Sequence, residues 1–421
     1  MTRKFYNTAG VGEIVGTSSS DHFFAYLSEG GTLAPDEIRS HLAWSTGILT
    51  PAGTYLQIVG QDMLVSWDLI RGSGARDTIF GSAGNDFIAF NNGGTGSGVG
   101  GFASIEEFLM GAGDDIVDFS AHGPGGVAFS KDYAVVDGGD GNDQIIGGGG
   151  AEFLFGGAGS DFIIGGGDRD EIMGGAGDDI LYGDDFGYNR TNASDSMWGE
   201  AGDDILHGGK GVDFLAGGEG DDLIYGGIDD DELTGEEGND FLYGEEGEDD
   251  IDGREGDDTI DGGPNWDRLL GGEGNDTITG GIGNDRIYGE DGMDLIFGGD
   301  DNDRIEGGAG SDRINGDAGA DQLMGGRDAD WFIFKGKGAL SGTDTILDFE
   351  DGTDRIVFEK LGVNRYSEDG GAGSVFARED GAGGVVLEGV DQHGANFAIN
   401  IMAAGTPLYA NQFSAADFIF A

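Results

Sequence analysis

Apolar residues recur at every ninth position between residues 199 and 333. This span divides into fifteen consecutive nine-residue units without an inserted or deleted residue, and position 8 of each unit is Leu, Ile or, once, Phe. The unit from Gly280 to Tyr288, which reads Gly-Gly-Ile-Gly-Asn-Asp-Arg-Ile-Tyr, is typical. Positions 7 to 9 alternate like a short strand with one side chain facing inward. The pattern therefore predicts a solenoid in which six-residue turns alternate with three-residue strands, with one buried side chain per unit.

The polar positions of the unit predict the turns. Position 1 is Gly and position 6 is Asp in all fifteen units, while position 4 is Gly in eleven of them and Asp or Asn in the other four (Asp229, Asn265, Asp301 and Asp328). Gly, Asn and Asp adopt positive φ most easily, so we expect position 4 to be a left-handed turn residue. Position 1 never carries a Cβ atom, which predicts a second tightly packed backbone site.

The rest of the chain repeats less regularly. In the first block of units, Glu152 at position 6 and Asp168 at position 4 depart from the pattern. We interpret the insertion after this block as a surface loop, with a binding loop as the alternative. The chain is divided into an irregular N-terminal region (1–71), degenerate repeats with an interruption (72–137), a first block (138–182), the insertion (183–198), the main block (199–333) and a C-terminal cap (334–421).

The nine-residue unit resembles Gly-Gly-x-Gly-x-Asp-x-U-x, the nonapeptide of the RTX family, in which U is a large apolar residue. The resemblance covers residues 72–421. It implies an all-β fold, a right-handed parallel β-roll with two units per coil and a β-rich C-terminal cap. Residues 342–358 resemble the segment that closes the roll in serralysin-type C-terminal domains. The first 71 residues resemble no family that we can name.

Calcium is the cofactor that the resemblance implies, with several ions per chain. In RTX proteins each ion lies between turns two units apart and is bound by position-6 carboxylates and turn carbonyls. The metal ligands that the resemblance implies are Asp86, Asp143, Asp161, Asp179, Asp204, Asp213, Asp222, Asp231, Asp240, Asp249, Asp258, Asp267, Asp276, Asp285, Asp294, Asp303, Asp312, Asp321 and Asp330.

Composition makes a metal necessary for this fold. The 421 residues carry a net charge of −60, and residues 199–333 hold 40 Asp and Glu against 7 Lys and Arg. One inward side chain per unit makes a thin core, and the acidic turns repel one another. Carboxylate and carbonyl oxygens suit a hard cation of flexible coordination. We therefore expect the repeats to be disordered without calcium and to fold on binding it. The competing interpretation, a solvated acidic tail, does not account for the strict period.

The resemblance to RTX proteins also predicts where the protein is located. No run of eighteen apolar residues predicts a membrane-spanning helix, and Asn7, Gly10 and Gly12 interrupt any signal-peptide core. RTX proteins use type I secretion with an uncleaved C-terminal signal, and the end of this chain, Ala415 to Ala421, is similar to such signals. The resemblance thus implies the type I secretion machinery as a partner and an extracellular or cell-surface location. The negative charge argues against nucleic acid as a partner.

No catalytic motif is recognisable in the sequence. The five His form no His-Glu-x-x-His, there is no Gly-x-Ser-x-Gly, and the chain has no Cys. We predict a non-enzymatic structural or adhesive component of a surface or matrix. The alternative is an extracellular enzyme with an unrecognised small catalytic region in residues 1–137. A pore-forming toxin is disfavoured because no apolar helical region is present.

Outward side chains repeat at eighteen-residue spacing and predict ladders on the two faces. The simplest interpretation is cross-strand stabilisation, with the Arg residues balancing acidic turns. The alternative is that the aromatic ladder binds a cell-surface or matrix glycan or protein. One face is predicted to carry Ile205, Leu223 and Phe241 beside His207, Tyr225 and Tyr243, and the other to carry Arg268, Arg286 and Arg304.

Overall fold

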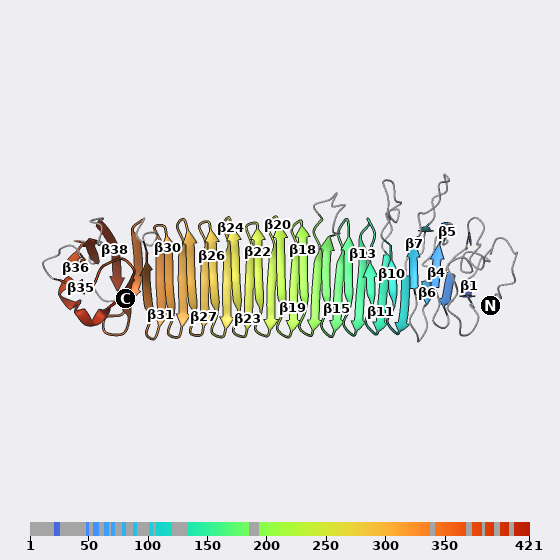
Figure 1. The fold of residues 1–421 in the computed structure, drawn as a ribbon, viewed down its shortest axis with the longest axis horizontal. Helices are drawn as coiled ribbons and strands as arrows, with labels where there is room; N and C mark the ends of the chain where they lie inside the picture. Colours follow the sequence, from blue (N-terminus) through green and yellow to red (C-terminus); the bar gives the residue numbers. More distant parts are fainter. Residues whose placement is uncertain are drawn as a thin grey trace. The chain divides into compact units, whose positions relative to one another are not determined.

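Parallel strands, stacked edge to edge, form the fold of the computed structural model (Figure 1). The chain divides into an N-terminal part (Met1–Gly217) and a C-terminal part (Gly218–Ala421). Between residues 1 and 106 only the strand backbones are described, and the structure describes residues 107–119, 134–184, 193–336, 342–367, 373–380, 384–390, 396–403 and 408–421 in full. Most of the predicted irregular region 1–71, and Asp86, lie outside the described residues.

From β9 onward the N-terminal part pairs strands two apart in the chain, so that even-numbered and odd-numbered strands form opposite sheets. Before β9 most pairings join strands three apart: β3, β6 and β9 in one sheet, β4, β7 and β10 in the other, and β2, β5 and β8 in a third. In β13 and β15, for example, Leu154 lies opposite Ile172. The strands are β1 (Asp21–Ala25), β2 (Ile48–Leu49), β3 (Thr54–Ile58), β4 (Met63–Ser66), β5 (Leu69–Arg71), β6 (Thr78–Phe80), β7 (Phe87–Phe90), β8 (Gly101–Ala103), β9 (Glu107–Ala112), β10 (Ile116–Asp118), β11 (Ala134–Asp140), β12 (Gln144–Ile146), β13 (Glu152–Ala158), β14 (Phe162–Gly166), β15 (Glu171–Ala176), β16 (Ile180–Asp184), β17 (Ser196–Ala201), β18 (Ile205–Lys210) and β19 (Phe214–Glu219), which crosses the boundary.

The C-terminal part continues the same parallel pairing and ends in antiparallel strands. Residues eighteen apart face each other, as Leu269 and Ile287 do in β25 and β27. Its elements are β20 (Leu223–Ile228), β21 (Glu232–Glu237), β22 (Phe241–Glu246), β23 (Asp250–Glu255), β24 (Thr259–Pro264), β25 (Arg268–Glu273), β26 (Thr277–Ile282), β27 (Arg286–Asp291), β28 (Leu295–Asp300), β29 (Arg304–Ala309), β30 (Arg313–Ala318), β31 (Gln322–Arg327), β32 (Trp331–Lys335), β33 (Asp344–Phe349), β34 (Arg355–Glu359), β35 (Arg365–Tyr366), β36 (Ser374–Glu379), β37 (Val385–Val390), β38 (Asn396–Ala403), the 3-10 helices η2 (Ala410–Gln412) and η3 (Ala415–Asp417), and β39 (Phe418–Phe420).

The apolar period predicts the core correctly. Every position-8 residue of the main block, from Leu206 to Phe332, is at most 1% exposed. These side chains line the interior between the two sheets. The fold is therefore an all-β parallel solenoid, as predicted, with one buried rung per nine residues.

The strands are longer than predicted. Most in the main block span six residues, positions 7 to 9 of one unit and 1 to 3 of the next, because the backbone keeps pairing past position 9. In β24 and β26, for example, Gly263 at position 2 lies opposite Gly281. The prediction of three-residue strands and six-residue turns was wrong, since only positions 4 to 6 form the turn.

Backbone angles confirm the prediction for position 4. Asp229 has a φ of 81° and Asn265 a φ of 87°, so both are left-handed. Position 2 is left-handed as well, even where it carries a bulky residue, as in Glu236 (81°) and Glu290 (74°). Left-handed geometry costs an L-residue about 1–2 kcal/mol, which the pairing on both sides has to offset. Sequence reasoning missed this site because Glu is not a typical left-handed residue.

The predicted insertion proves to be part of a coil. In β17, Met197 lies opposite Ile172 of β15, so residues 193–198 occupy positions 4 to 9 of a unit whose positions 1 and 2 are Gly183 and Asp184. The extra length therefore falls entirely at position 3. The loop predicted there, now confined to residues 185–192, lies outside the described residues.

The cap extends the solenoid before closing it. Strands β33 and β34 stack in parallel on β31 and β32, and β39 pairs in parallel with β34. Strand β38 pairs in parallel with β33 and antiparallel with β37. The end of the roll is thus covered by paired backbone rather than left as an open edge.

Candidate metal centres

The position-6 aspartates form hydrogen-bonded series along the solenoid. The backbone N–H of Asp258 donates to Oδ1 of Asp276 (2.8 Å), and that of Asp276 donates to Oδ1 of Asp294 (2.9 Å). Each of these side chains is at most 1% exposed. One carboxylate oxygen per coil therefore has a structural role, because it satisfies a buried N–H group of the preceding coil.

The second oxygen of the same carboxylates is buried without a hydrogen-bond partner. Native proteins rarely leave buried polar atoms unsatisfied, so a repeated series of them fits a row of ion-binding positions. The Oδ2 atoms in this position belong to Asp143, Asp161, Asp170, Asp179, Asp195, Asp240, Asp249, Asp258, Asp267, Asp276, Asp285, Asp294, Asp303, Asp312 and Asp321.

The glycine at position 1 leaves room beside each of these oxygens. A Cβ atom added to Gly262 would lie 2.6 Å from Oδ2 of Asp267 and 2.8 Å from the carbonyl oxygen of Gly280, in the next coil of the same sheet. A carboxylate oxygen and a carbonyl oxygen thus both lie close to the glycine. We call each such pair of oxygens beside a position-1 glycine a cradle. The requirement for glycine at position 1, predicted from its invariance, is explained by this close approach.

The donor set of the cradles fits calcium. Carboxylate and carbonyl oxygens are the ligands that Ca²⁺ prefers, and glycine supplies space for an ion of variable coordination. Among the described residues no three His, Cys, Asp or Glu side chains gather into a metal site. The carbonyl oxygens beside the carboxylates, such as that of Gly280, could contribute to the coordination. The bound ion would neutralise Oδ2 and join consecutive coils.

Burial raises the pKa of the position-6 carboxyl groups in the absence of metal. In Asp267 burial and the carboxylates of Asp249 and Asp285 raise the pKa to about 8, against the lowering effect of the N–H donated by Asp249. Burial is also the largest cause for Asp258 and Asp276, where the pKa is about 7. At neutral pH the metal-free fold thus holds carboxyls that either bind a proton or carry an uncompensated charge.

Acid is therefore expected to rescue the metal-free fold. Burial raises the pKa of Asp267 from its ordinary value of 3.8 to about 8, so from about pH 4 to pH 8 the metal-free fold binds more protons than the unfolded chain. Its stability is full below this window and falls as the pH rises through it. In EDTA, we expect circular dichroism to report β structure near pH 5 and its loss near pH 7.5. A β signal in EDTA that grows with pH would contradict this sign.

All predicted ligands except Asp86 lie in these series. In the N-terminal part the series join Asp179 to Asp204 and Asp195 to Asp213. In the C-terminal part they begin with the bonds from Asp222 to Asp240 and from Asp231 to Asp249. The structure brings these carboxylates into one repeated geometry. Their assignment as individual calcium ligands stays a prediction.

Five further aspartates belong to the same series but are absent from the predicted set. The N–H of Asp321 donates to Oδ1 of Asp344 (3.1 Å), and that of Asp330 to Oδ1 of Asp354 (3.1 Å). Both acceptors end a Gly-Thr-Asp sequence, a signal that could have identified them. Asp170 and Asp195 also accept a backbone N–H through Oδ1, and Asp115 joins the series through its own N–H, which donates to Oδ1 of Asp143.

The last two cradles differ from the rest. The three atoms nearest to a Cβ added at Gly316 all belong to Asp321, and at Gly325 all belong to Asp330, so no carbonyl of a following coil is among them. At Gly325, the carboxylate of Asp348 instead accepts the N–H group (3.0 Å). These two turns adjoin the place where the nine-residue period ends, at residue 333.

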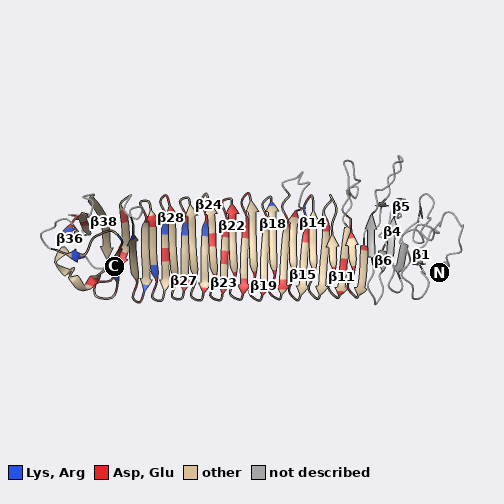
Figure 2. Cartoon of the chain, viewed as in Figure 1, with Lys and Arg blue, Asp and Glu red and all other residues tan. Residues whose placement is uncertain are grey.

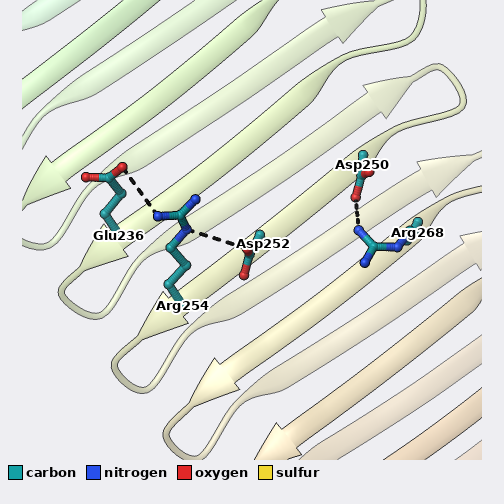
Figure 3. A network of polar contacts seen from close by, with 5 residues as sticks. All are labelled: Glu236, Asp250, Asp252, Arg254 and Arg268. Carbon is teal, nitrogen blue, oxygen red and sulfur yellow. Dashed lines mark hydrogen bonds and ion pairs between the residues drawn. The ribbon is translucent and has the colours of Figure 1, made fainter.

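Charge is unevenly spread over the outer faces of the strands (Figure 2). Arg254 lies within 3.7 Å of Glu236 and 3.5 Å of Asp252, and Arg268 lies within 2.6 Å of Asp250. Figure 3 draws these contacts as dashed lines. The Arg268 contact agrees with local compensation of acidic charge. Exposed pairs of this kind contribute at most about 1 kcal/mol each. They do not replace the neutralisation that the buried carboxylates require.

Aromatic residues stack on the opposite sheet, as predicted. Tyr225 and Tyr243 lie 5.1 Å apart with ring planes 13° from parallel. Leu223 lies opposite Phe241, which is 47% exposed. This group, Leu223, Tyr225, Phe241 and Tyr243, is called the aromatic patch below. In the N-terminal part, His207 stacks on Tyr182 at 4.7 Å.

A parallel solenoid whose turns present buried carboxylate and carbonyl oxygens defines a calcium-binding repeat protein. Comparison with protein families agrees with this class. The family model described as RTX calcium-binding nonapeptide repeat (4 copies) matches residues 66–94, 135–163, 155–186, 191–224, 225–260, 261–296 and 297–332.

These matches span more than half of the chain, which therefore belongs to the RTX calcium-binding repeat family. Its cofactor is calcium, and the number of repeats implies several ions. No match was found among curated proteins. In the described parts of the chain, no helix is long and apolar enough to cross a membrane.

Proposed function

We propose that this protein is a secreted structural or adhesive component that folds on binding calcium after type I export. The observation that carries the proposal is the row of buried, unpaired Oδ2 atoms beside position-1 glycines. Extracellular calcium sites bind in the range of about 10⁻⁴–10⁻³ M. A chain with such sites stays unfolded in the cytosol and folds where calcium is abundant.

The end of the chain supports export before folding. Residues Phe418–Phe420 form β39, which pairs with β34, and Phe418 is 6% exposed against Phe413 and Tyr366. A C-terminal secretion signal in this segment is accessible only while the cap is unfolded. Low cytosolic calcium would therefore keep the segment available to the type I secretion machinery.

The aromatic patch supports an adhesive role. Its tyrosines and Phe241 lie on a sheet face outside the core, where flat rings suit contact with a glycan or a partner protein. Core packing does not require these rings, because the position-8 residues fill the interior. Their stacking also stabilises the sheet, so the test has to separate binding from stability.

Replacing Tyr225 and Tyr243 together by Ser is expected to abolish attachment. The probes are immobilised neutral and acidic glycans and a cell-surface fraction, each presented in calcium. We expect at least about a tenfold loss of retention, equivalent to about 1.4 kcal/mol, with calcium-induced folding preserved. The double variant Thr259→Ser/Thr277→Ser on the same sheet is the matched control. Equal retention of both variants would reject the adhesive role of the patch.

A further inference from the structure

The turn that carries residues 185–192 keeps the elements of a metal site. Gly183 stands at position 1 and Asp195 at position 6, although twelve sequence steps separate them instead of five. The family matches end at residue 186 and resume at residue 191, so no single match contains both residues. This coil is thus outside the regular nonapeptide pattern.

Asp195 repeats the geometry of the regular coils. The backbone N–H of Asp170 donates to its Oδ1 (2.8 Å), and its own N–H donates to Oδ1 of Asp213 (2.7 Å). The side chain is 1% exposed, and its Oδ2 is buried without a hydrogen-bond partner. The carboxylate is therefore held in position on one oxygen and unsatisfied on the other.

The cradle beside Asp195 is complete. A Cβ added to Gly183 would lie 2.5 Å from Oδ2 of Asp195 and 2.5 Å from the carbonyl oxygen of Gly208. The same two kinds of oxygen would lie 2.6 and 2.8 Å from a Cβ added to Gly262, in an uninterrupted unit. The eight residues at position 3 have not displaced the donors on either side.

This turn also carries a carboxylate that most other turns lack. Asp184 occupies position 2, which in many other units is Gly, and its Oδ2 accepts the N–H of Lys210 (2.9 Å). Asp184 is not placed as a ligand, but its negative charge acts on Asp195 and adds to the attraction for a divalent cation at that carboxylate.

We propose that Asp195 and the Gly208 carbonyl bind a calcium ion beside Gly183, and that this ion joins the two ends of the expanded turn to the roll. The inference rests on the proposed calcium-dependent folding and extends it to a site that nonapeptide spacing does not reveal. Despite the longer spacing in sequence, Gly183, Asp195 and Gly208 keep the geometry of a regular unit. Calcium then stabilises positions 1 and 6 of this coil as it does in a regular unit.

Hydrogen exchange with mass spectrometry tests this site locally. Peptides covering residues 171–184 and 196–210 of the full-length chain are followed as calcium is added. In Asp195→Asn, Oδ1 can still accept the Asp170 N–H, but the charge is lost. We expect the calcium concentration for half-protection of these peptides to rise about tenfold or more. Asp203→Asn, an exposed position-5 change of equal charge in the next unit, should leave it unchanged.

The possible outcomes distinguish failure of the Asp195 site from failure of calcium-dependent folding as a whole. An unchanged midpoint in Asp195→Asn, with a normal response of the wild type, overturns the site and leaves the proposed function intact. A wild-type chain that gains no protection anywhere with calcium overturns the proposed function itself. Full protection of Asp195→Asn at saturating calcium shows that the variant folds. Equilibrium dialysis supplies a second measurement, in which this variant is expected to bind one ion fewer per chain than Asp203→Asn.

Discussion

Chelation of calcium at neutral pH is expected to unfold the solenoid. In EDTA near pH 7.5, far-UV circular dichroism should lose most of its β signal, and added calcium should restore it. The reason lies in the position-6 carboxylates, many of which, such as those of Asp161, Asp267 and Asp294, have a buried and unpaired Oδ2 atom. The thin core, with one position-8 residue per unit, cannot offset their charge.

The free-energy cost of the unsatisfied carboxylates is large enough to unfold the metal-free solenoid, not only to loosen it. An unsatisfied buried polar group costs about 1–3 kcal/mol, and more when it is charged. Typical domains are stable by only about 5–15 kcal/mol, so about ten such groups are enough to remove the folded state. Each ion would instead satisfy the Oδ2 atom and link it to a carbonyl of the next coil.

Magnesium is the informative control for the chelation experiment. It demands near-octahedral coordination and retains water, so it should not restore the β signal at concentrations at which calcium does. Equal β content in EDTA and in calcium near pH 7.5 would show that the buried carboxylates do not depend on metal. Restoration by magnesium at the same concentration would contradict the fit of the cradles to calcium.

A methyl group placed in one cradle of the main block is expected to have the second-largest effect on stability and on calcium binding. In Gly271→Ala the new methyl group would overlap Oδ2 of Asp276 and lie 2.7 Å from the carbonyl oxygen of Gly289. Overpacking alone costs about 1–3 kcal/mol, and the displaced ion adds to this loss. We expect the chain to bind one calcium ion fewer. Its free energy of unfolding in calcium should fall by about 2–4 kcal/mol.

Two variants separate the metal from the backbone. Gly352→Ala is the control for the substitution itself, because a Cβ there meets no atom within 4 Å although φ is +83°. It should cost only the left-handed strain, about 1–2 kcal/mol, with unchanged calcium stoichiometry. Asp276→Asn removes the charge while keeping the size of the side chain, and it should lose the same ion as Gly271→Ala. An unaltered ion count in both cradle variants would show that this cradle holds no calcium.

Sequence reasoning succeeded where one residue acts alone. The position-8 residues were identified as core because the apolar period is uninterrupted, and all of them in the main block are at most 1% exposed. Position 4 was identified because only a few residue types adopt positive φ. Both inferences need a single side chain and its own backbone, which the sequence displays directly.

Prediction from the sequence failed where the spacing between equivalent positions of the repeat departs from nine residues. The regular bonds join aspartates eighteen residues apart, but Asp170 reaches Asp195 over 25 residues and Asp321 reaches Asp344 over 23. A search for nonapeptides cannot find these partners. The left-handed geometry of Glu236 and Glu290 was hidden for a related reason, since pairing with adjacent strands imposes it against local preference.

The sequence by itself determined the class of this protein: the repeat, the buried rung and the acidic turns that predict calcium binding. Each of these is a local steric or electrostatic requirement, written once in every nine residues. Only the tertiary structure decided that Asp195, Asp344 and Asp354 join the aspartate series and that positions 1 to 3 extend the strands. Those features depend on which backbone groups meet between coils, and that pairing is set by the stacking of strands rather than by distance along the chain.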